Sequence, residues 1–203
     1  MKKLLLFPLL ALLLWTGSAW AAALTPPDVL VKTTTDEVLN ILRKDKSLFN
    51  NDDKIYELVE AKVLPNFDFD RMTQLAVGRY WREATPAQKE ALVKQFKSLL
   101  VRTYAGSLHA FNNQTVDFRP FFMPPDATDV TVKTIIQQPG GQAPLPVDYS
   151  LYKTPYGWKV YDVAIDSVSL VLNYRSSFGQ VVRRSGIDGL IKSLQAKNDP
   201  DQR

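Results

Sequence analysis

Residues 158–178, with the sequence WKVYDVAIDSVSLVLNYRSSF, constrain the fold of this chain more than any other stretch. The first half predicts a β-strand, because side chains alternate across a strand and large apolar residues recur here at alternate positions. One face of the strand is expected to carry Trp158, Val160 and Asp162, and the other Lys159, Tyr161, Val163 and Ile165. Asp166 or Ser167 can then cap a helix that contains the apolar residues around Leu170. The chain must therefore place a half-buried strand directly before an apolar helical segment.

Three earlier runs alternate in the same way. They lie at residues 116–118, 130–136 and 147–151, and turn signals rich in proline and glycine separate them at residues 138–141 and 155–157. Strands joined by such short connections pair as antiparallel hairpins. The sequence therefore predicts an antiparallel sheet of about four strands.

Helical periodicity dominates the rest of the chain. We expect helices from Pro26 (capped by Thr25) to about Arg43, from Asp52 to Pro65, after Asp68, from Thr85 to about Leu108, and on both sides of Gly186. The best of these begins with the capping box Thr85-Pro86-Ala87-Gln88. It carries one apolar face made of Leu92, Phe96, Leu99, Leu100 and Tyr104. The predicted fold class is α+β, a curved antiparallel sheet with several helices packed on its concave side.

The first 21 residues have the pattern of a cleavable secretory signal peptide. Lys2 and Lys3 precede the apolar run 4–14, and Ala19-Trp20-Ala21 fits a small-x-small cleavage site. An uncleaved anchor is the alternative, although the run is short for a membrane-spanning helix. We therefore expect export to the periplasm and a single mature domain, residues 22–203. Without the two leader lysines, 23 basic residues face 21 acidic ones, which argues against nucleic-acid binding and permits only a mild preference for anionic surfaces.

Little in the sequence points to catalysis. The chain contains no cysteine, and His109 is its single histidine, which excludes thiol chemistry and histidine-rich metal sites. Asp68 and Asp70 could hold a metal, but a carboxylate before a helix is more often an N-cap, so we expect no metal site. Asp162 and Asp166 could form an acid–base pair, although structural roles are more common. No catalytic residue and no cofactor are expected.

Three segments together carry a family resemblance. The stretch 158–178, the segment GIDGLIKSL at 186–194 and the segment GRYWREATPAQKEALVKQF at 78–96 resemble the MlaC or toluene-tolerance family of periplasmic phospholipid-binding proteins. The resemblance covers nearly all of the chain after the leader. One departure is visible after the strand, where the family usually has Glu-Gly-Val-Ser and this chain has Asp166-Ser167-Val168-Ser169. The missing glycine bears on the geometry of that turn.

The resemblance implies a carrier that shuttles glycerophospholipid between the outer and inner membranes and maintains the lipid asymmetry of the outer membrane. The implied partners are an outer-membrane lipoprotein–porin complex, an inner-membrane ABC transporter complex with an MCE-domain protein, and, transiently, the membrane surface. Two other readings of the residues stay open. One is a small-molecule enzyme on a cone-shaped α+β fold, and the other is a periplasmic protein-interaction module.

In this family architecture, an apolar cavity between sheet and helices would hold the lipid. Combining it with the periodicity above, we expect the lipid-binding residues to be Phe96, Leu99, Leu100, Val132, Tyr149, Leu151, Tyr161, Val163 and Leu170, with Arg175 at the mouth meeting a phosphate.

Overall fold

The computed structural model describes residues 24–199, so the predicted signal peptide lies outside the described residues. In chain order, the described part contains α1 (Pro27–Lys44), α2 (Asp52–Lys62), α3 (Phe69–Val77), α4 (Pro86–Tyr104), β1 (Thr115–Phe118), β2 (Asp129–Gln137), β3 (Leu145–Thr154), β4 (Gly157–Ile165), β5 (Val168–Ser169) and α5 (Leu170–Asn198). Short 3-10 turns join several of them, of which η2 (Leu64–Asn66), η3 (Gly78–Arg82) and η4 (Ala105–Ala110) matter below. The predicted α+β class is confirmed.

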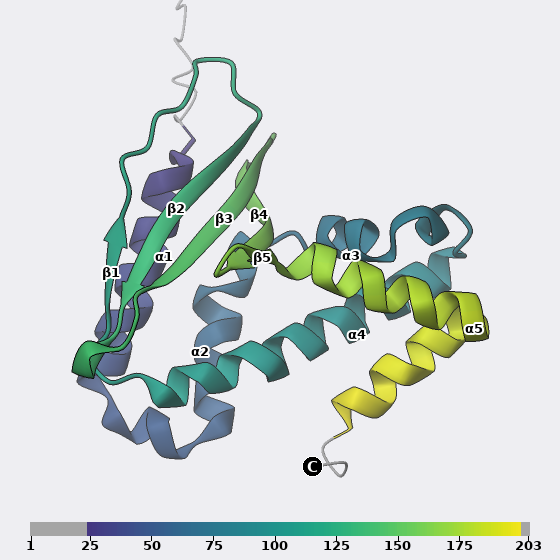
Figure 1. Ribbon diagram of the computed structural model, residues 1–203, viewed down its shortest axis with the longest axis horizontal. Coiled ribbons are helices and arrows are strands. Elements are labelled where there is room, and N and C mark those ends of the chain that lie inside the picture. Colours follow the sequence, from purple (N-terminus) through teal and green to yellow (C-terminus); the bar gives the residue numbers. More distant parts are fainter. Residues whose placement is uncertain (1–23, 200–203) are drawn as a thin grey trace, which may run out of the picture.

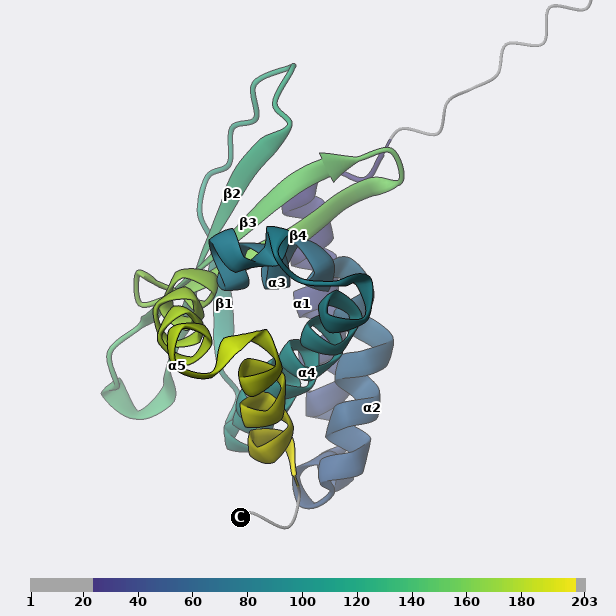
Figure 2. The ribbon, with the colours of Figure 1, turned by 90° about the vertical axis from the view of Figure 1, so that its right-hand side faces the viewer.

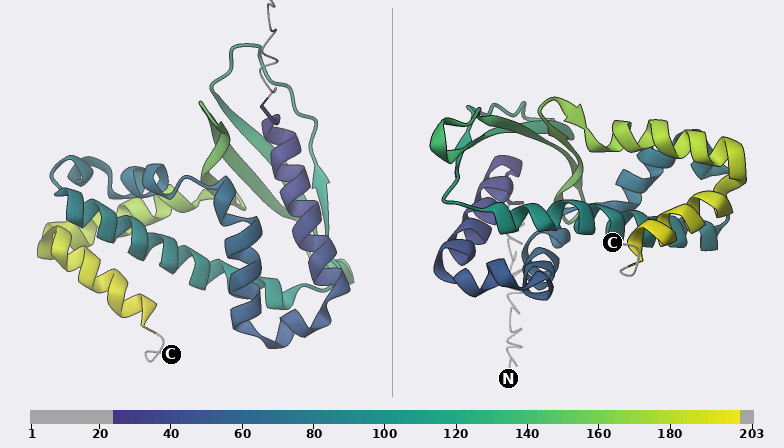
Figure 3. Two further views of the ribbon diagram at one scale, coloured as in Figure 1. Left: turned by 180° about the vertical axis from the view of Figure 1, so that it is seen from behind. Right: turned by 60° about the horizontal axis from the view of Figure 1, so that its bottom comes forward.

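The sheet is an open antiparallel meander in the order β1-β2-β3-β4-β5. It has one strand more than the four expected, because the two-residue β5 pairs with the end of β4 before α5 begins. Helix α1 lies along the inner face of the curved sheet, and Figure 1 and Figure 3 show the strands arching over it. Leu30 and Val31 of α1, Tyr104 at the end of α4 and Leu170 at the start of α5 pack against the cluster on this face, so several helices pack on the sheet, as expected. The rest of α4 and α5 extends away from the sheet.

Local chemistry explains most helix starts. The Asp68 carboxylate accepts a hydrogen bond from the Arg71 N–H at 2.8 Å, as an N-cap does. The predicted capping box between Thr85 and Gln88 is present at the start of α4. Three boundaries differ from expectation. Helix α2 ends at Lys62, and Pro65 lies in the 3-10 turn η2 after it. Pro26, not Thr25, is the N-cap of α1, and α4 ends at Tyr104 with the tighter η4 after it.

Helix α5 starts later than the sequence indicated and is broken in the middle. Its N-cap is Ser169, whose hydroxyl accepts from the Leu172 N–H, because Asp166 and Ser167 form the turn between β4 and β5 instead. Gly186 has φ 71° and ψ −177°, a left-handed backbone that glycine adopts without steric cost. The chain reverses there, so the last part of α5 returns toward α4, as Figure 2 shows.

The core divides into clusters that follow this arrangement. One cluster lies between α1 and the sheet and contains Val31, Val132, Leu151, Trp158 and Val160 among its buried residues. A second joins α3, α4 and α5 around Phe96, whose ring meets the rings of Tyr174 and Phe178 edge-on. A third packs α1 against α2 and η4. Within residues 24–199, no helix is long and apolar enough to cross a membrane.

Candidate functional site

An apolar pocket lies between α1 and the inner face of the sheet. Its volume is about 220 Å³. Fourteen residues line it: Leu30, Val31, Thr34, Thr35, Val38, Leu39, Val63, Asn66, Phe67, Leu108, Val116, Ile136, Tyr149 and Val160. Most of these side chains are hydrocarbon, and none is acidic or basic. The pocket can therefore accept an apolar ligand without desolvating a charge.

Two periodicities create this lining. Val31 and Val38 are seven residues apart on α1, which places them on the same side of the helix two turns apart. On the sheet, Ile136, Tyr149 and Val160 come from β2, β3 and β4 and point toward α1 because alternate residues share a face. The turn η2 and the Phe67 after it close one side, where Asp68 N–H bonds to the Val160 carbonyl at 2.9 Å.

The few polar groups of the lining are satisfied or held neutral. Asn66 donates to the Thr34 hydroxyl at 2.9 Å and to the Lys62 carbonyl at 3.2 Å. Burial raises the pKa of the Tyr149 phenol to about 12, against the opposing effect of a hydrogen bond with Thr134. Tyr149 is therefore neutral at ordinary pH, so the pocket stays without charge.

Eight of the ten predicted lipid-binding residues fall into three groups. Tyr149 lines the pocket itself. Val132, Leu151, Val163 and Leu170 belong to the buried cluster between α1 and the sheet. Phe96, Leu99 and Leu100 lie in the other cluster, among α3, α4 and α5. These three residues of α4 thus pack among helices, whereas the expectation had them lining a cavity between the sheet and the helices.

Tyr161 does not share a face with Val163, which corrects the alternation expected from the sequence. Leu151 lies opposite Val160, but Ser150 lies opposite Asp162, so Tyr161 is an extra residue in β4. Such a β-bulge resets the alternation. Val160 and Val163 both belong to the inner cluster, while the Tyr161 hydroxyl donates to the Asp129 carboxylate at 2.9 Å on the other side of the sheet.

Arg175 lies away from the pocket. It is an exposed residue of α5 that rests against Gly78 of η3, and it is not among the lining residues. The Arg175 guanidinium was expected at the mouth of the lipid cavity, and it lies beside η3 instead.

Sequence reasoning missed the contribution of α1. Six of the lining residues come from this helix, and none was among the predicted lipid-binding residues. The signal that could have found them is the spacing of Val31 and Val38, with threonines rather than charged residues between them at 34 and 35. With threonines at these two positions, the pocket side of the helix can lie against an apolar ligand without burying a charge.

The carboxylates considered for chemistry have structural partners. Asp162 accepts from the backbone N–H of Val163 at 2.9 Å and of Val171 at 3.1 Å, and from the Ser169 hydroxyl at 2.5 Å. It therefore holds the start of α5, and Asp166 sits in the turn. His109 bridges the Phe49 carbonyl and the Asp52 carboxylate. Among the described residues, no three acidic, histidine or cysteine side chains are grouped closely enough to hold a metal ion.

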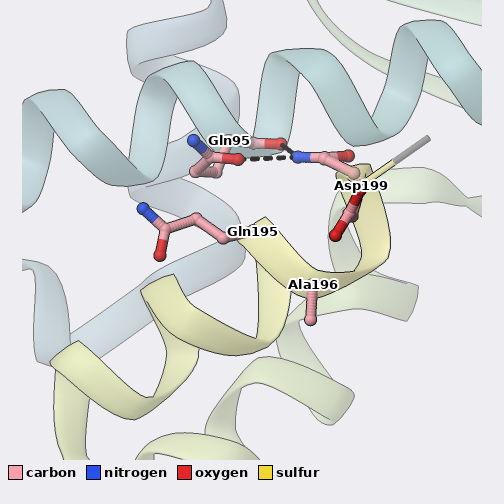
Figure 4. Close-up of a pocket in the computed structure, with 5 residues that line it drawn as sticks. Gln95, Gln195, Ala196 and Asp199 are labelled. Atoms are coloured by element: carbon pink, nitrogen blue, oxygen red, sulfur yellow. Dashed lines mark hydrogen bonds between the residues drawn. The ribbon is translucent and has the colours of Figure 1, made fainter. Parts of the chain in front are cut away.

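A second hollow, of about 560 Å³, lies where the end of α5 meets α4 (Figure 4). Its lining is Gln95, Gln195, Ala196, Asn198 and Asp199, and the Asn198 amide donates to both the backbone and the side-chain oxygen of Gln95. It is larger than the apolar pocket, but it is shallow and polar, so a ligand there would keep most of its contact with water. We therefore take the apolar pocket as the candidate site.

Comparisons with known proteins agree with the resemblance. A family model described as "MlaC protein" matches residues 32–196, most of the chain. The toluene tolerance protein ttg2D of Pseudomonas putida is 30% identical over 82% of this chain and 77% of its own length. The intermembrane phospholipid transport system binding protein MlaC of Haemophilus influenzae is 25% identical over 86% of this chain and 83% of its own.

A solved structure is similar as well. The phospholipid-binding protein of Ralstonia solanacearum, determined in complex with a phospholipid, is 41% identical, with a TM-score of 0.80. The match covers 86% of this chain and 97% of that one.

Proposed function

This chain belongs to the MlaC protein family, and on that basis we propose that it is a periplasmic phospholipid carrier. In this proposal residues 1–21 are a cleaved signal peptide, and residues 22–203 are one phospholipid-binding domain. The carrier takes glycerophospholipid between the outer and inner membranes and so maintains outer-membrane lipid asymmetry.

The observation that carries the proposal is the uncharged apolar pocket between α1 and the sheet. It occurs in a fold whose 41% identical relative was solved with a phospholipid bound. An enzyme would need groups that hold or move a proton, and the lining offers only two threonine hydroxyls, one amide and one phenol. A protein-interaction module would need an apolar patch on the outside, whereas these side chains face inward.

The energetics require that a carrier enclose the acyl chains. A phospholipid with roughly 30 methylenes would cost on the order of 20–25 kcal/mol to leave bare in water, at about 0.8 kcal/mol for each methylene. The pocket of about 220 Å³ is smaller than the roughly 300–1,000 Å³ typical of ligand pockets. Lipid uptake therefore requires α1 and the sheet to move apart. Two polar contacts of α1 near the pocket, Asn66 to Thr34 and the exposed Lys62–Glu37 ion pair at 3.2 Å, tie it to η2 and α2 and not to the sheet, so they do not oppose this separation directly.

We assign the acyl chains to the space between α1 and the inner face of the sheet. As the two separate, the chains reach Tyr149 first and then the inner residues Val132, Leu151, Val163 and Leu170. Phe96, Leu99, Leu100, Tyr161 and Arg175, which the sequence also suggested, lie elsewhere and have structural or surface roles in this proposal. The head group stays in water, so the carrier discriminates only weakly between different head groups.

The proposed partners are those that the family implies, an outer-membrane lipoprotein–porin complex and an inner-membrane ABC transporter complex with an MCE-domain protein. The carrier catalyses no reaction and needs no cofactor. Energy for directional transport enters at the transporter.

Native mass spectrometry of the purified mature protein tests the proposal, with organic extraction and lipid analysis of the same sample. We expect a stoichiometric glycerophospholipid that survives purification, and its mass gives the number of acyl chains. Protein that stays empty after incubation with phospholipid vesicles would overturn the carrier proposal and favour the enzyme or the interaction module.

A further inference from the structure

A group of arginines gathers where η3 meets the first half of α5. Arg175 and Arg183 are eight residues apart on α5 with Gly179 midway, so both lie on one side of the helix. Arg79 comes from η3, which contacts α5. All three side chains are exposed. We call this group the arginine cluster.

The guanidinium groups lie close together around two residues of η3, Tyr80 and Gly78. Arg79 donates a hydrogen bond to the Tyr80 hydroxyl at 2.9 Å. This guanidinium group lowers the pKa of the Tyr80 phenol most, and the guanidinium group of Arg183 lowers it further. Gly78 has φ 63°, and a Cβ there would lie only 3.0 Å from Nε of Arg175. A side chain at position 78 would therefore push Arg175 away from η3.

The cluster is a local excess of positive charge. The segments 78–84 and 175–184 contain five arginines and a single acidic residue, Glu83. The ion pairs of residues 24–199 do not include Arg79, Arg175 or Arg183. Because like charges repel, such a group is unfavourable in isolation and is relieved when an anion binds.

We propose that the arginine cluster docks the carrier on the phosphate groups of an anionic phospholipid bilayer. Guanidinium groups suit phosphate because their planar N–H donors match its oxygens in pairs. This docking surface rests on the proposed carrier function and names how the carrier meets a membrane.

The cluster fits a bilayer better than an acidic protein. A stable protein interface needs a desolvated apolar centre, yet the exposed large hydrophobic residues of the described chain are Leu24, Val29, Phe122, Tyr156, Val168 and Leu172. Only Leu172, one turn before Arg175 on α5, lies next to the cluster, and one exposed leucine does not make such a centre. Attraction to an anionic bilayer needs only charge near the surface. Figure 1 also places η3's neighbour α3 and the first half of α5 away from β1, β2 and α1, so docking leaves the pocket uncovered.

Co-flotation with vesicles tests this surface. The mature protein is mixed with vesicles of phosphatidylcholine alone or of phosphatidylcholine with phosphatidylglycerol, at low and high salt. The variants are Arg79→Gln/Arg175→Gln/Arg183→Gln and, as the control, Lys44→Gln/Lys94→Gln/Lys197→Gln, which removes the same charge from three exposed lysines elsewhere. A third protein, Arg79→Lys/Arg175→Lys/Arg183→Lys, keeps the charge and so separates the loss of charge from the loss of the arginine side chains.

We expect salt-sensitive binding of the wild type to the anionic vesicles only. Each arginine near such a surface contributes roughly a fivefold gain in partitioning, so the arginine-to-glutamine variant should lose about 100-fold. The lysine control and the charge-preserving variant should lose far less. Equal binding by both glutamine variants would overturn the proposal.

The phospholipid content of each preparation is measured by native mass spectrometry in parallel. Wild-type protein that is loaded with lipid but does not bind anionic vesicles would overturn the docking surface and leave the carrier function intact. That result would favour an acidic protein as the partner of the arginine cluster. Wild-type protein that remains empty after incubation with the vesicles overturns the carrier function on which the docking surface rests.

Discussion

The guanidinium carbon of Arg71 lies 3.9 Å from the centre of the Tyr152 ring and 4.6 Å from that of Tyr161. The Tyr152 hydroxyl donates to Asp68, the residue that caps α3, and Arg71 also pairs with Asp129 at 3.6 Å. Five side chains from α3, β2, β3 and β4 therefore join the helices to the outer face of the sheet. The bulge at Tyr161 is what turns the second ring outward to complete this contact.

We expect Arg71→Ala to lower the free energy of unfolding by about 1–2 kcal/mol, the size of a partly desolvated cation–π contact with a weak ion pair. Arg71→Lys should recover only part, because an ammonium cannot stack as a plane. Urea unfolding measures both. Arg184→Ala, an exposed arginine on α5, is the control and should stay within about 0.5 kcal/mol of the wild type. Equal values for the alanine variants would show that the Arg71 contact adds nothing.

The Tyr161 bulge also shows where sequence reasoning ended. Alternation located β1 to β4 and the capping box located α4, because both signals are local. The bulge was not predictable from alternation, since Tyr161, Asp162 and Val163 can each face either side of a half-buried strand. The bulge depends on contacts with distant parts of the chain: the pairing with β3, the Arg71 guanidinium on the Tyr161 ring, and the Asp129 carboxylate that accepts from its hydroxyl.

The same distinction applies to the pocket. The helix at α1 and the apolar face of α4 were both predicted, but which residues of each pack against the sheet depends on tertiary packing. The Phe96 ring packs against the rings of Tyr174 and Phe178. This contact holds α4 in the core cluster that it forms with α3 and α5. The inner face of the sheet then packs against α1, against Phe67, and against Tyr104 and Leu170 at the ends of α4 and α5 that lie nearest to it.

A bulky residue on the pocket side of α1 should exclude lipid. Thr35 lines the pocket, whereas Thr33, two residues away, is exposed. We expect Thr35→Trp to reduce the phospholipid content of the purified protein by at least about threefold, because the indole occupies volume that the acyl chains need. Thr33→Trp is the matched control and should retain its lipid. Native mass spectrometry reads both, and equal lipid content in the two would place the acyl chains elsewhere.

Tyr149 predicts a loss of stability at alkaline pH. Burial raises its folded-state pKa to about 12, above the unfolded value of about 10. Between these values the unfolded chain releases the phenolic proton and the folded protein retains it, so the unfolded state gains stability as pH rises. The contribution is fully present below pH ~10 and disappears by about pH 12, with a magnitude of roughly 2–3 kcal/mol.

We therefore expect Tyr149→Phe to lose less stability between about pH 9 and pH 11.5 than the wild type. Urea unfolding at each pH measures this difference, with the pH 7 value of each protein as its own reference. Tyr156→Phe, at a side chain that is 92% exposed, is the control and should follow the wild type. Parallel pH profiles for all three proteins would contradict the burial of the Tyr149 hydroxyl.

The turn between β4 and β5 carries a backbone strain that one substitution should relieve. Ile165 pairs with Val168, and the two residues between them, Asp166 and Ser167, have φ of 48° and 66°. Positive φ at both positions is the type I′ geometry, which favours glycine at the second. Ser167 occupies the position where the family usually has that glycine. The hairpin therefore places a serine in the left-handed region, where its Cβ adds steric strain.

We expect Ser167→Gly to raise the free energy of unfolding by about 0.5–1 kcal/mol, since relief of the left-handed strain exceeds the added entropy of glycine in the unfolded chain. Ser176→Gly, at an exposed position inside the regular part of α5, should have the opposite sign, lowering stability by about 0.5–1 kcal/mol. Chemical denaturation of the two variants beside the wild type measures both effects. Destabilisation by both glycines would mean that Ser167 is not strained, and that a contact of its side chain, rather than its backbone, sets the turn before α5.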